Sequence, residues 1–342
     1  MYPPLCNISA VKFWTAYGAP DMPTAYPIPT PTHFDPPDSE LMQRLQSIPA
    51  LQLGEPLHFL CRDLKQRRHA ANVICHAREV LPPRHSVFSF GNELSVVSPE
   101  LSFLEMGAVY PVERLSQYGT MLCGKYGIKT ATQDASSVKS TRFDTDLFKR
   151  TPVTSRELVE SYLASCHSLH GRTIARRAFP YVFDRSRSPM ETATVLLLSM
   201  PYHYGGRNLP QPQLNIPVAI KQPMQVRNWN GSISALDAFE CDLVWHSKRG
   251  IVVVEYQGEL GHSGESNIHR DARKHNALEN SGSKVRALTK EALLDYELFT
   301  GFANDLAKLL RCYRKSKLSD IDKRQKALHR LLLGKYLTMR VF

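Results

Sequence analysis

The clearest pattern of polar and apolar positions lies in residues 239–257, FECDLVWHSKRGIVVVEYQ. Apolar residues alternate from position 239 to position 245, which is typical of a strand with one buried face. The β-branched run at residues 251–254 favours a second, buried strand. Residues 247–250, Ser-Lys-Arg-Gly, are suited to a turn between them. The pattern therefore predicts a β-hairpin.

The register of this hairpin decides whether two acidic residues face each other. A loop of two or of four residues, counted outward, pairs Asp242 with Glu255 and places Gln257 on the same face as Glu255. Directly opposed side chains have Cβ atoms about 4.5–5.5 Å apart. Two carboxylates at that distance repel, and a divalent cation with oxygen ligands relieves the repulsion. A three-residue loop would instead put the two carboxylates on opposite faces.

Shorter patterns predict further elements on both sides of the hairpin. Strands are expected at 57–61 and 72–77, in a second hairpin at 86–98 around Gly91 and Asn92, and at 284–288. Capping residues, terminal glycines and apolar spacing indicate helices; they occur at 40–46, 99–110, 155–166, from Gly171, from Pro189, up to Gly282, and through 291–342.

The first 50 residues differ from the rest of the chain. They are rich in proline and show little periodicity, which predicts an extended, poorly packed arm. The alternative is that the aromatic side chains of Phe13, Trp14 and Tyr17 dock on the body of the protein.

Length, composition and charge narrow the classes of function. A chain of 342 residues with 42% hydrophobic residues predicts two or three domains. A net charge of +11 favours an acidic partner, with nucleic acid ahead of a membrane surface. Seven cysteines without a Cys-x-x-Cys pair favour reduced thiols in a cytoplasmic protein. No apolar run approaches the ~20 residues that span a bilayer, and no signal peptide is indicated.

Asp242, followed by Glu255-Tyr256-Gln257 at the end of an apolar strand, resembles the core of the PD-(D/E)XK nuclease pattern. The resemblance extends over residues 186–295 and is carried by SPMETATVLLL, CDLVW, VVVEYQG, His262 and HRDARKHNALENSGSKVRALT. This order is similar to that of small endonuclease-like domains related to very-short-patch-repair endonucleases. Those domains have a helix Glu, a strand Asp, a Glu-x-Asp-Gly with a nearby His, and an Arg-Asp-rich helix before a short strand. Gln257 departs from the pattern, because the wider superfamily has Lys there and this branch has Asp.

The resemblance implies a Mg²⁺ (or Mn²⁺) site. Asp242 and Glu255 would bind the metal with the Tyr256 carbonyl, and Glu191 would join them through water. The metal would polarise the scissile phosphate and activate the attacking water. Gln257 would orient that water or a phosphate oxygen, although it cannot act as a base.

Several of these residues have other interpretations. His262 would assist proton transfer or contact phosphate, but a lone loop histidine often does neither. Glu191 also fits a capping box that begins at Ser188. Asp242 and Glu255 could be solvent-facing carboxylates, although a buried unpaired carboxylate would be costly. The acidic alternatives nearby, whose spacing to Glu255 fits less well, are Asp237 and Glu240.

Basic residues on two predicted helices are candidates for contact with the DNA backbone, since residues three and four apart share a helix face. A solvated face is the alternative interpretation. The candidates are Arg270, Arg273 and Lys274 on one helix, and Arg172 and Arg176, with Arg177 beside them, on the other.

Upstream, residues 57–126 resemble the C-terminal part of type IV (abortive-infection) antitoxins. The resemblance includes a basic strand pair with a His in the second strand and a Val-Ser-Pro-Glu-x-x-Phe-Leu helix start. The matching residues are His76, Val97, Ser98, Pro99, Glu100, Phe103 and Leu104.

The sequence thus predicts an α/β protein with a restriction-endonuclease-like mixed sheet flanked by helices and a smaller α+β module before it. The expected segments are an arm (1–55), an antitoxin-like module (56–130), a connector (131–185), an endonuclease-like domain (186–295) and a basic helical tail (296–342). The favoured function is Mg²⁺-dependent endonuclease cleavage of DNA, in bacterial defence, mobile-element or repair biology. The alternative is a catalytically degraded nucleic-acid-binding or antitoxin-like regulator that binds a toxin or antitoxin partner.

Overall fold

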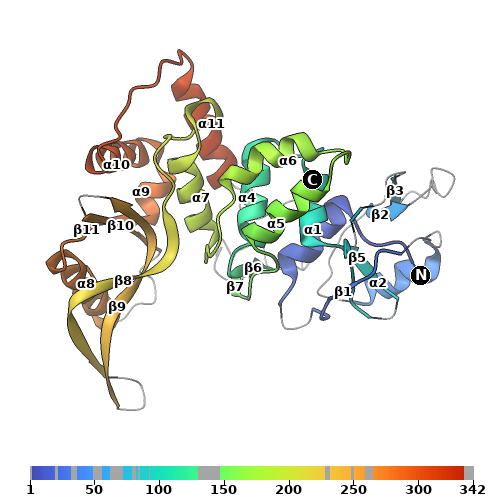
Figure 1. Cartoon of the computed structure of the whole chain (residues 1–342), viewed down its shortest axis with the longest axis horizontal. Helices are drawn as coiled ribbons and strands as arrows, with labels where there is room; N and C mark the ends of the chain where they lie inside the picture. Colours follow the sequence, from blue (N-terminus) through green and yellow to red (C-terminus); the bar gives the residue numbers. More distant parts are fainter. Residues whose placement is uncertain are drawn as a thin grey trace, which may run out of the picture. The chain divides into compact units, whose positions relative to one another are not determined.

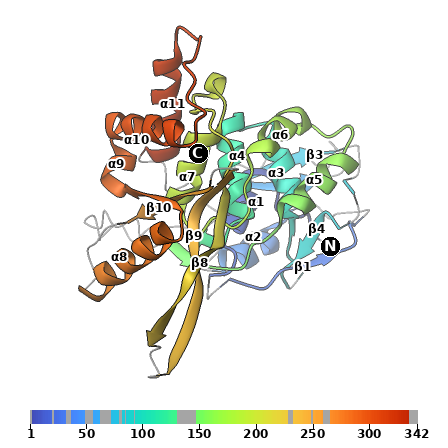
Figure 2. The same cartoon turned by 60° about the vertical axis from the view of Figure 1, so that its left-hand side comes forward.

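The computed structural model describes residues 2–19, 22–31, 37–48, 56–61, 72–78, 82–83, 85–91, 93–129, 147–227, 232–247, 250–258 and 265–334, without the side chains of 226, 227, 233 and 265–270. Within this part, the chain divides into two compact units at Ser188 and Pro189. Figure 1 labels most of the elements of both units, and Figure 2 adds α3 and β4. The segment between the strands expected at 57–61 and 72–77, and residues 131–146 of the predicted connector, lie outside the described residues.

The first unit contains short strands in three small sheets. β1 (Tyr26–Ile28), β4 (Val87–Ser89) and β5 (Ser95–Val97) form an antiparallel sheet in the order β1-β4-β5. β2 (Leu57–Cys61) and β3 (Val73–Ala77) pair in parallel, and β6 (Tyr126–Ile128) pairs with β7 (Leu147–Lys149). The predicted strand pair and second hairpin are therefore present at their predicted positions.

The helices of the first unit include two that the sequence pattern does not predict, at residues 7–16 and 112–122. They are α1 (Asn7–Ala16), α2 (Ser39–Gln46), α3 (Pro99–Met106), α4 (Val112–Leu122), α5 (Arg156–Ser165) and α6 (Arg172–Ala178). The Ser98 and Ser155 side chains cap α3 and α5 by accepting hydrogen bonds from backbone N–H groups, as expected.

The expectation of a poorly packed arm is wrong at α1. Phe13 and Trp14 are fully buried, and Trp14 Nε1 donates a hydrogen bond to the Val97 carbonyl at 2.8 Å. Side chains are buried around most of the helix circumference, so the sequence carries no amphipathic period. The alternative interpretation, in which these aromatic residues dock on the body, is the correct one.

The second unit is built on a mixed four-stranded sheet in the order β11-β10-β9-β8. It runs α7 (Pro189–Ser199), β8 (Gln213–Arg227), β9 (Ile233–Ser247), β10 (Gly250–Gln257), α8 (Glu265–Asn280) and β11 (Lys284–Thr289). β8, β9 and β10 pair antiparallel, and β11 is parallel to β10. A parallel neighbour requires a crossover, and α8 supplies it. The expectation of an α/β protein is confirmed at this level.

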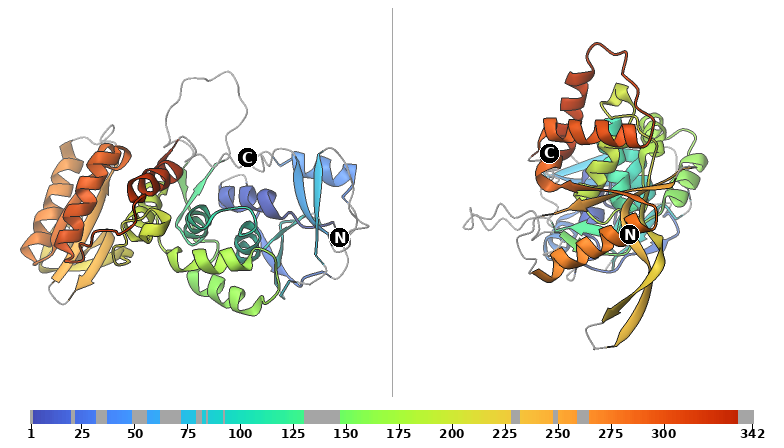
Figure 3. Two further views of the ribbon diagram at one scale, coloured as in Figure 1. Left: turned by 90° about the horizontal axis from the view of Figure 1, so that it is seen from above. Right: turned by 90° about the vertical axis from the view of Figure 1, so that its left-hand side faces the viewer.

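Helices cover both faces of the sheet. α8 lies on one side of β10 and β11, and α9 (Lys290–Leu294) and α10 (Tyr296–Leu309) lie on the other (Figures 2 and 3). The core on the α8 side consists of Val218, Ile220, Cys241, Val244, Val253, Leu278 and Val285. The longer strands β8 and β9 project past the rest of the sheet as a two-stranded ribbon (Figure 2).

The C-terminal segment of the second unit is helical, as predicted. α10 buries Phe299 and Leu306, and α11 (Ile321–Leu333) packs against α7. A 3-10 turn (Tyr202–Tyr204) contacts α11. Among the described residues, no helix has the length and apolar character to cross a bilayer.

Candidate functional site

The predicted register of the β9–β10 hairpin is confirmed. Ser247 pairs with Gly250, and the ladder continues to Leu243 opposite Val254. In the same register, Asp242 and Glu255 are the next two residues beyond this pair. The Tyr256 N–H donates a hydrogen bond to Asp242 Oδ2 at 2.8 Å, so the Asp242 carboxylate lies beside the Glu255–Tyr256 peptide.

Regular side-chain alternation breaks at Asp242. Cys241 and Val244 both belong to the core on the α8 side, although a regular strand would direct them to opposite faces. The β8–β9 ladder is broken at the same level: it pairs residue 214 with 243 and 216 with 241, and Asn215 between them has φ of 48°. The expectation of unbroken alternation is therefore wrong here, because a local irregularity reorients both strands.

Glu255 is held by a lysine from α8. Lys274 Nζ donates to Glu255 Oε2 at 2.6 Å and to the Glu240 carbonyl at 2.7 Å. Burial raises the pKa of the Glu255 carboxyl above its ordinary value, the nearby Asp242 charge raises it further, and Lys274 opposes both effects. The geometry gathers two carboxylates and one ammonium group at the end of β10.

The other oxygen of Glu255 is poorly satisfied. Oε1 is buried and has no hydrogen-bond partner among the described residues other than the adjacent Cys241 thiol, which is a weak donor. A buried carboxylate oxygen without a strong donor retains its affinity for a cation. This orphaned oxygen fits a metal ligand.

Glu191 joins the arrangement through Asn215. Its side chain on α7 is buried and accepts a hydrogen bond from Asn215 Nδ2 at 2.7 Å. Asn215 is the residue of β8 that lies opposite Asp242 in the broken ladder. The elements α7, β8, β9, β10 and α8 each contribute one residue to this polar site, which consists of Glu191, Asn215, Asp242, Glu255 and Lys274.

The polar site supplies fewer metal ligands than the sequence predicts. Within the described ranges, no group of three or more His, Cys, Asp or Glu residues could hold a metal ion. The oxygen donors that fit an ion are the carboxylates of Asp242 and Glu255 and the Tyr256 carbonyl. The Glu191 carboxylate accepts a hydrogen bond from the Asn215 side chain. Glu191 is therefore linked to the polar site through Asn215.

The remaining predicted residues differ in their placement. Gln257 is exposed at the end of β10, opposite Thr289 of β11. His262 and the Arg270 side chain lie outside the described residues. Arg273 is exposed on α8. Lys274, expected to contact DNA, instead binds Glu255.

Arg172 and Arg176 belong to the first unit, on α6. Arg176 is exposed, and Arg172 Nε donates to the Leu163 carbonyl at 3.4 Å. In the antitoxin-like segment, His76 lies beside His58, with 2.8 Å between their ring nitrogens.

Sequence reasoning missed Asn215 and the role of Lys274. No periodic signal marks Asn215, because its position follows from the break in the β8–β9 ladder. Helical spacing places Lys274 on one basic face with Arg270 and Arg273. Its half-buried position was not evident from helical spacing alone.

No protein-family model matches the chain, and neither the curated proteins nor the solved structures include a significant match. The function of the polar site is therefore inferred from its own geometry.

Proposed function

We propose that the second unit is a Mg²⁺-dependent endonuclease with a PD-(D/E)XK-like fold that hydrolyses DNA phosphodiester bonds. The observation that carries this proposal is the pair of carboxylates at Asp242 and Glu255, with one buried oxygen that lacks a strong partner. The order of elements supports it, because the resemblance implies a helix Glu, a strand Asp, a strand Glu, a basic helix and a short strand. These features fall on α7, β9, β10, α8 and β11.

Each residue of the polar site has a role in this proposal. Asp242, Glu255 and the Tyr256 carbonyl would hold a Mg²⁺ ion. A bound Mg²⁺ ion supplies Lewis-acid chemistry toward the phosphate and acidifies water. Glu191 and Asn215 position β8 beside Asp242. Lys274 places an ammonium group beside Glu255, where it can donate to a phosphate oxygen.

Lys274 also compensates for Gln257. The superfamily pattern has a lysine at the third position of the Glu-x-Lys motif, and this chain has a glutamine, which carries no charge. Lys274 reaches Glu255 from α8, at a different place in the sequence. The charge that the motif lacks is therefore present at the site.

The biological setting is part of the proposal. A chain with a net charge of +11 favours binding to a negatively charged polymer such as DNA. We propose that the enzyme acts in bacterial defence, mobile-element or repair biology in the cytoplasm. The antitoxin-like segment of the first unit is the proposed contact for a toxin or antitoxin partner.

The proposal is tested by nicking of supercoiled plasmid with Mg²⁺ or Mn²⁺. Asp242→Asn and Glu255→Gln should each lower the nicking rate by more than the roughly 10–100-fold typical of residues around a metal site. Asp237→Asn is the matched control, since Asp237 is an exposed carboxylate on the same strand. Equal nicking by all four proteins would refute the assignment.

A second candidate function is a nucleic-acid-binding regulator with a degraded site. The observation in its favour is that Lys274 already neutralises Glu255. A regulator would bind DNA equally well with EDTA or Mg²⁺ and would nick none of it. Gel-shift measurements beside the nicking assay separate the two functions.

A further inference from the structure

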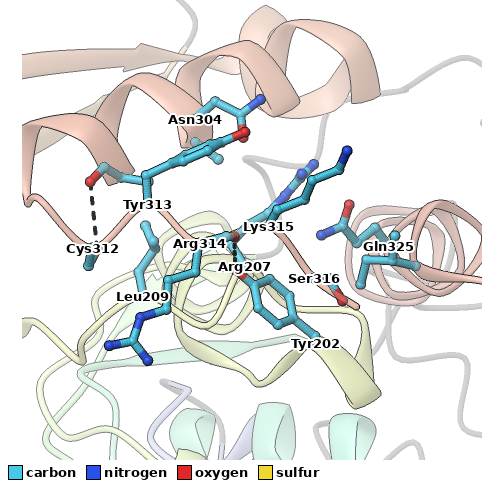
Figure 4. A pocket seen from close by; sticks show the side chains of 13 residues that line it. Tyr202, Arg207, Leu209, Asn304, Cys312, Tyr313, Arg314, Lys315, Ser316 and Gln325 are labelled. Atoms are coloured by element: carbon cyan, nitrogen blue, oxygen red, sulfur yellow. Dashed lines mark hydrogen bonds between the residues drawn. The ribbon is translucent and has the colours of Figure 1, made fainter. Parts of the chain in front are cut away.

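A polar cavity in the second unit is lined by none of the five residues of the polar site. It is bounded by α10, by the segment 312–316 that leads to α11, and by residues 202–209 that follow α7 (Figure 4). Its volume is about 170 Å³. Ligand pockets for drug-sized molecules usually measure about 300–1,000 Å³, so this cavity suits a smaller group.

The lining of the cavity is positively charged. Arg207, Arg314 and Lys315 contribute to it, and none of its residues is acidic. In the part of the chain that the structure describes, no carboxylate forms an ion pair with these three cations. Further hydrogen-bonding side chains line the cavity, namely Tyr202, Asn304, Ser316 and Gln325.

Arg207 is fixed by its neighbours. Its guanidinium lies over the rings of Tyr296 and Phe299, 5.8 and 5.9 Å from their centroids, and Nη2 donates to Thr300 Oγ1 at 2.5 Å. Burial lowers the pKa of Arg207, because the charged form has lost part of its hydration. Tyr296 and the Asp322 carboxylate oppose this effect, and an anion in the cavity would add a further favourable interaction with the Arg207 charge.

The segment that carries the other two cations is also anchored. The Tyr202 hydroxyl donates to the Arg314 carbonyl at 2.6 Å, and the Cys312 N–H donates to the Ala307 carbonyl at 3.0 Å (Figure 4). These bonds tie residues 312–314 to the walls of the cavity. Arg314 and Lys315 are thereby held on its rim while their side chains stay exposed to solvent.

We propose that this cavity binds a phosphate group. Phosphate offers several oxygens to guanidinium and ammonium donors, and arginine binds it through two parallel hydrogen bonds. The volume admits the phosphate and leaves the remainder of its carrier outside. Two carriers share this chemistry: the phosphorylated end of a nucleic-acid strand, and a free phosphate compound. The proposal does not depend on nuclease activity.

Binding is measured in EDTA, by calorimetry with three probes: inorganic phosphate, a short 5′-phosphorylated single-stranded oligonucleotide, and the same oligonucleotide with a 5′-hydroxyl. The test variant is Arg314→Gln/Lys315→Gln. The matched control is Lys317→Gln/Lys323→Gln, which removes the same charge from exposed residues outside the cavity lining. Circular dichroism verifies the fold of each protein.

Inorganic phosphate should bind the wild type saturably, and the test variant should weaken that binding by about tenfold or more. The control should change it far less. Arg207→Lys, which keeps the charge but loses the two-pronged geometry, should also weaken binding.

Tighter binding of the phosphorylated oligonucleotide than of its hydroxyl form would identify a strand end as the carrier. Equal affinity for the two oligonucleotides, together with phosphate binding, would identify a free phosphate compound. Absence of saturable phosphate binding, or equal losses in test and control variants, would overturn the proposal.

Discussion

Among the described residues, Glu105 of the first unit and Glu255 of the second are both shielded from solvent and paired with a cation, but their carboxylates differ in how completely they are satisfied. Glu105 of the first unit is 2% exposed and receives Arg78 Nη2 on Oε1 and the Asn7 N–H on Oε2, both at 2.9 Å. Glu255 of the second unit is 19% exposed, receives Lys274 on Oε2 alone, and lies near Asp242.

This difference separates a structural carboxylate from a candidate functional one. Strong donors saturate both oxygens of Glu105, so it has little remaining capacity for a cation. Glu255 retains an oxygen without a strong donor and a second negative charge nearby. Burial raises the pKa of both glutamates, so the direction of a pKa shift does not distinguish them.

The largest expected effect is on stability. Glu105→Gln should lower the free energy of unfolding of the first unit by about 3–5 kcal/mol, because Arg78 would be left buried without its counter-charge. Glu255→Gln should cost the second unit much less, since it also relieves the repulsion from Asp242. Urea denaturation followed by fluorescence measures both. Equal losses in the free energy of unfolding would contradict the distinction between the two glutamates.

A smaller effect concerns the coupling of Lys274 to metal. Lys274→Gln should destabilise the second unit by about 1–3 kcal/mol, because two neighbouring carboxylates would lack a cation. Added Mg²⁺ should recover more stability in this variant than in the wild type, since the ion can take the place of the ammonium charge. Thermal unfolding with and without Mg²⁺ measures this.

The control for that prediction is Arg273→Gln, which removes an exposed charge from the adjacent position on α8. Its response to Mg²⁺ should equal that of the wild type. If Mg²⁺ stabilises Lys274→Gln no more than it stabilises this control, the Asp242 and Glu255 carboxylates do not hold the ion.

The smallest effect is on pH dependence. The pKa of Glu255 is higher in the folded state than the ordinary value of about 4.3, so the folded state binds this proton more tightly than the unfolded state does. Stability from this group is therefore greatest at acidic pH and decreases as pH rises from the ordinary value through the raised one. Glu255→Gln should reduce the decrease between pH 4 and pH 7, as measured by urea midpoints. An unchanged slope would contradict the assigned shift.

Sequence patterning predicted the hairpin and its register because a two-residue period and a short loop leave few alternatives. It did not predict the break at Asp242, since that depends on Asn215 adopting a positive φ on the neighbouring strand. Nor did it predict β8, whose Pro217 and Pro223 argue against a strand. Helix α1 was missed because its apolar residues follow no single-face pattern.

Those two prolines also affect self-association. β8 is an edge strand of the four-stranded sheet, and a proline has no N–H with which to pair another chain. The opposite edge, β11, exposes Lys284 and Arg286, whose charges repel a second copy of the same strand. Both borders of the sheet therefore resist extension by a further strand. We expect any dimer of this unit to form through its helices.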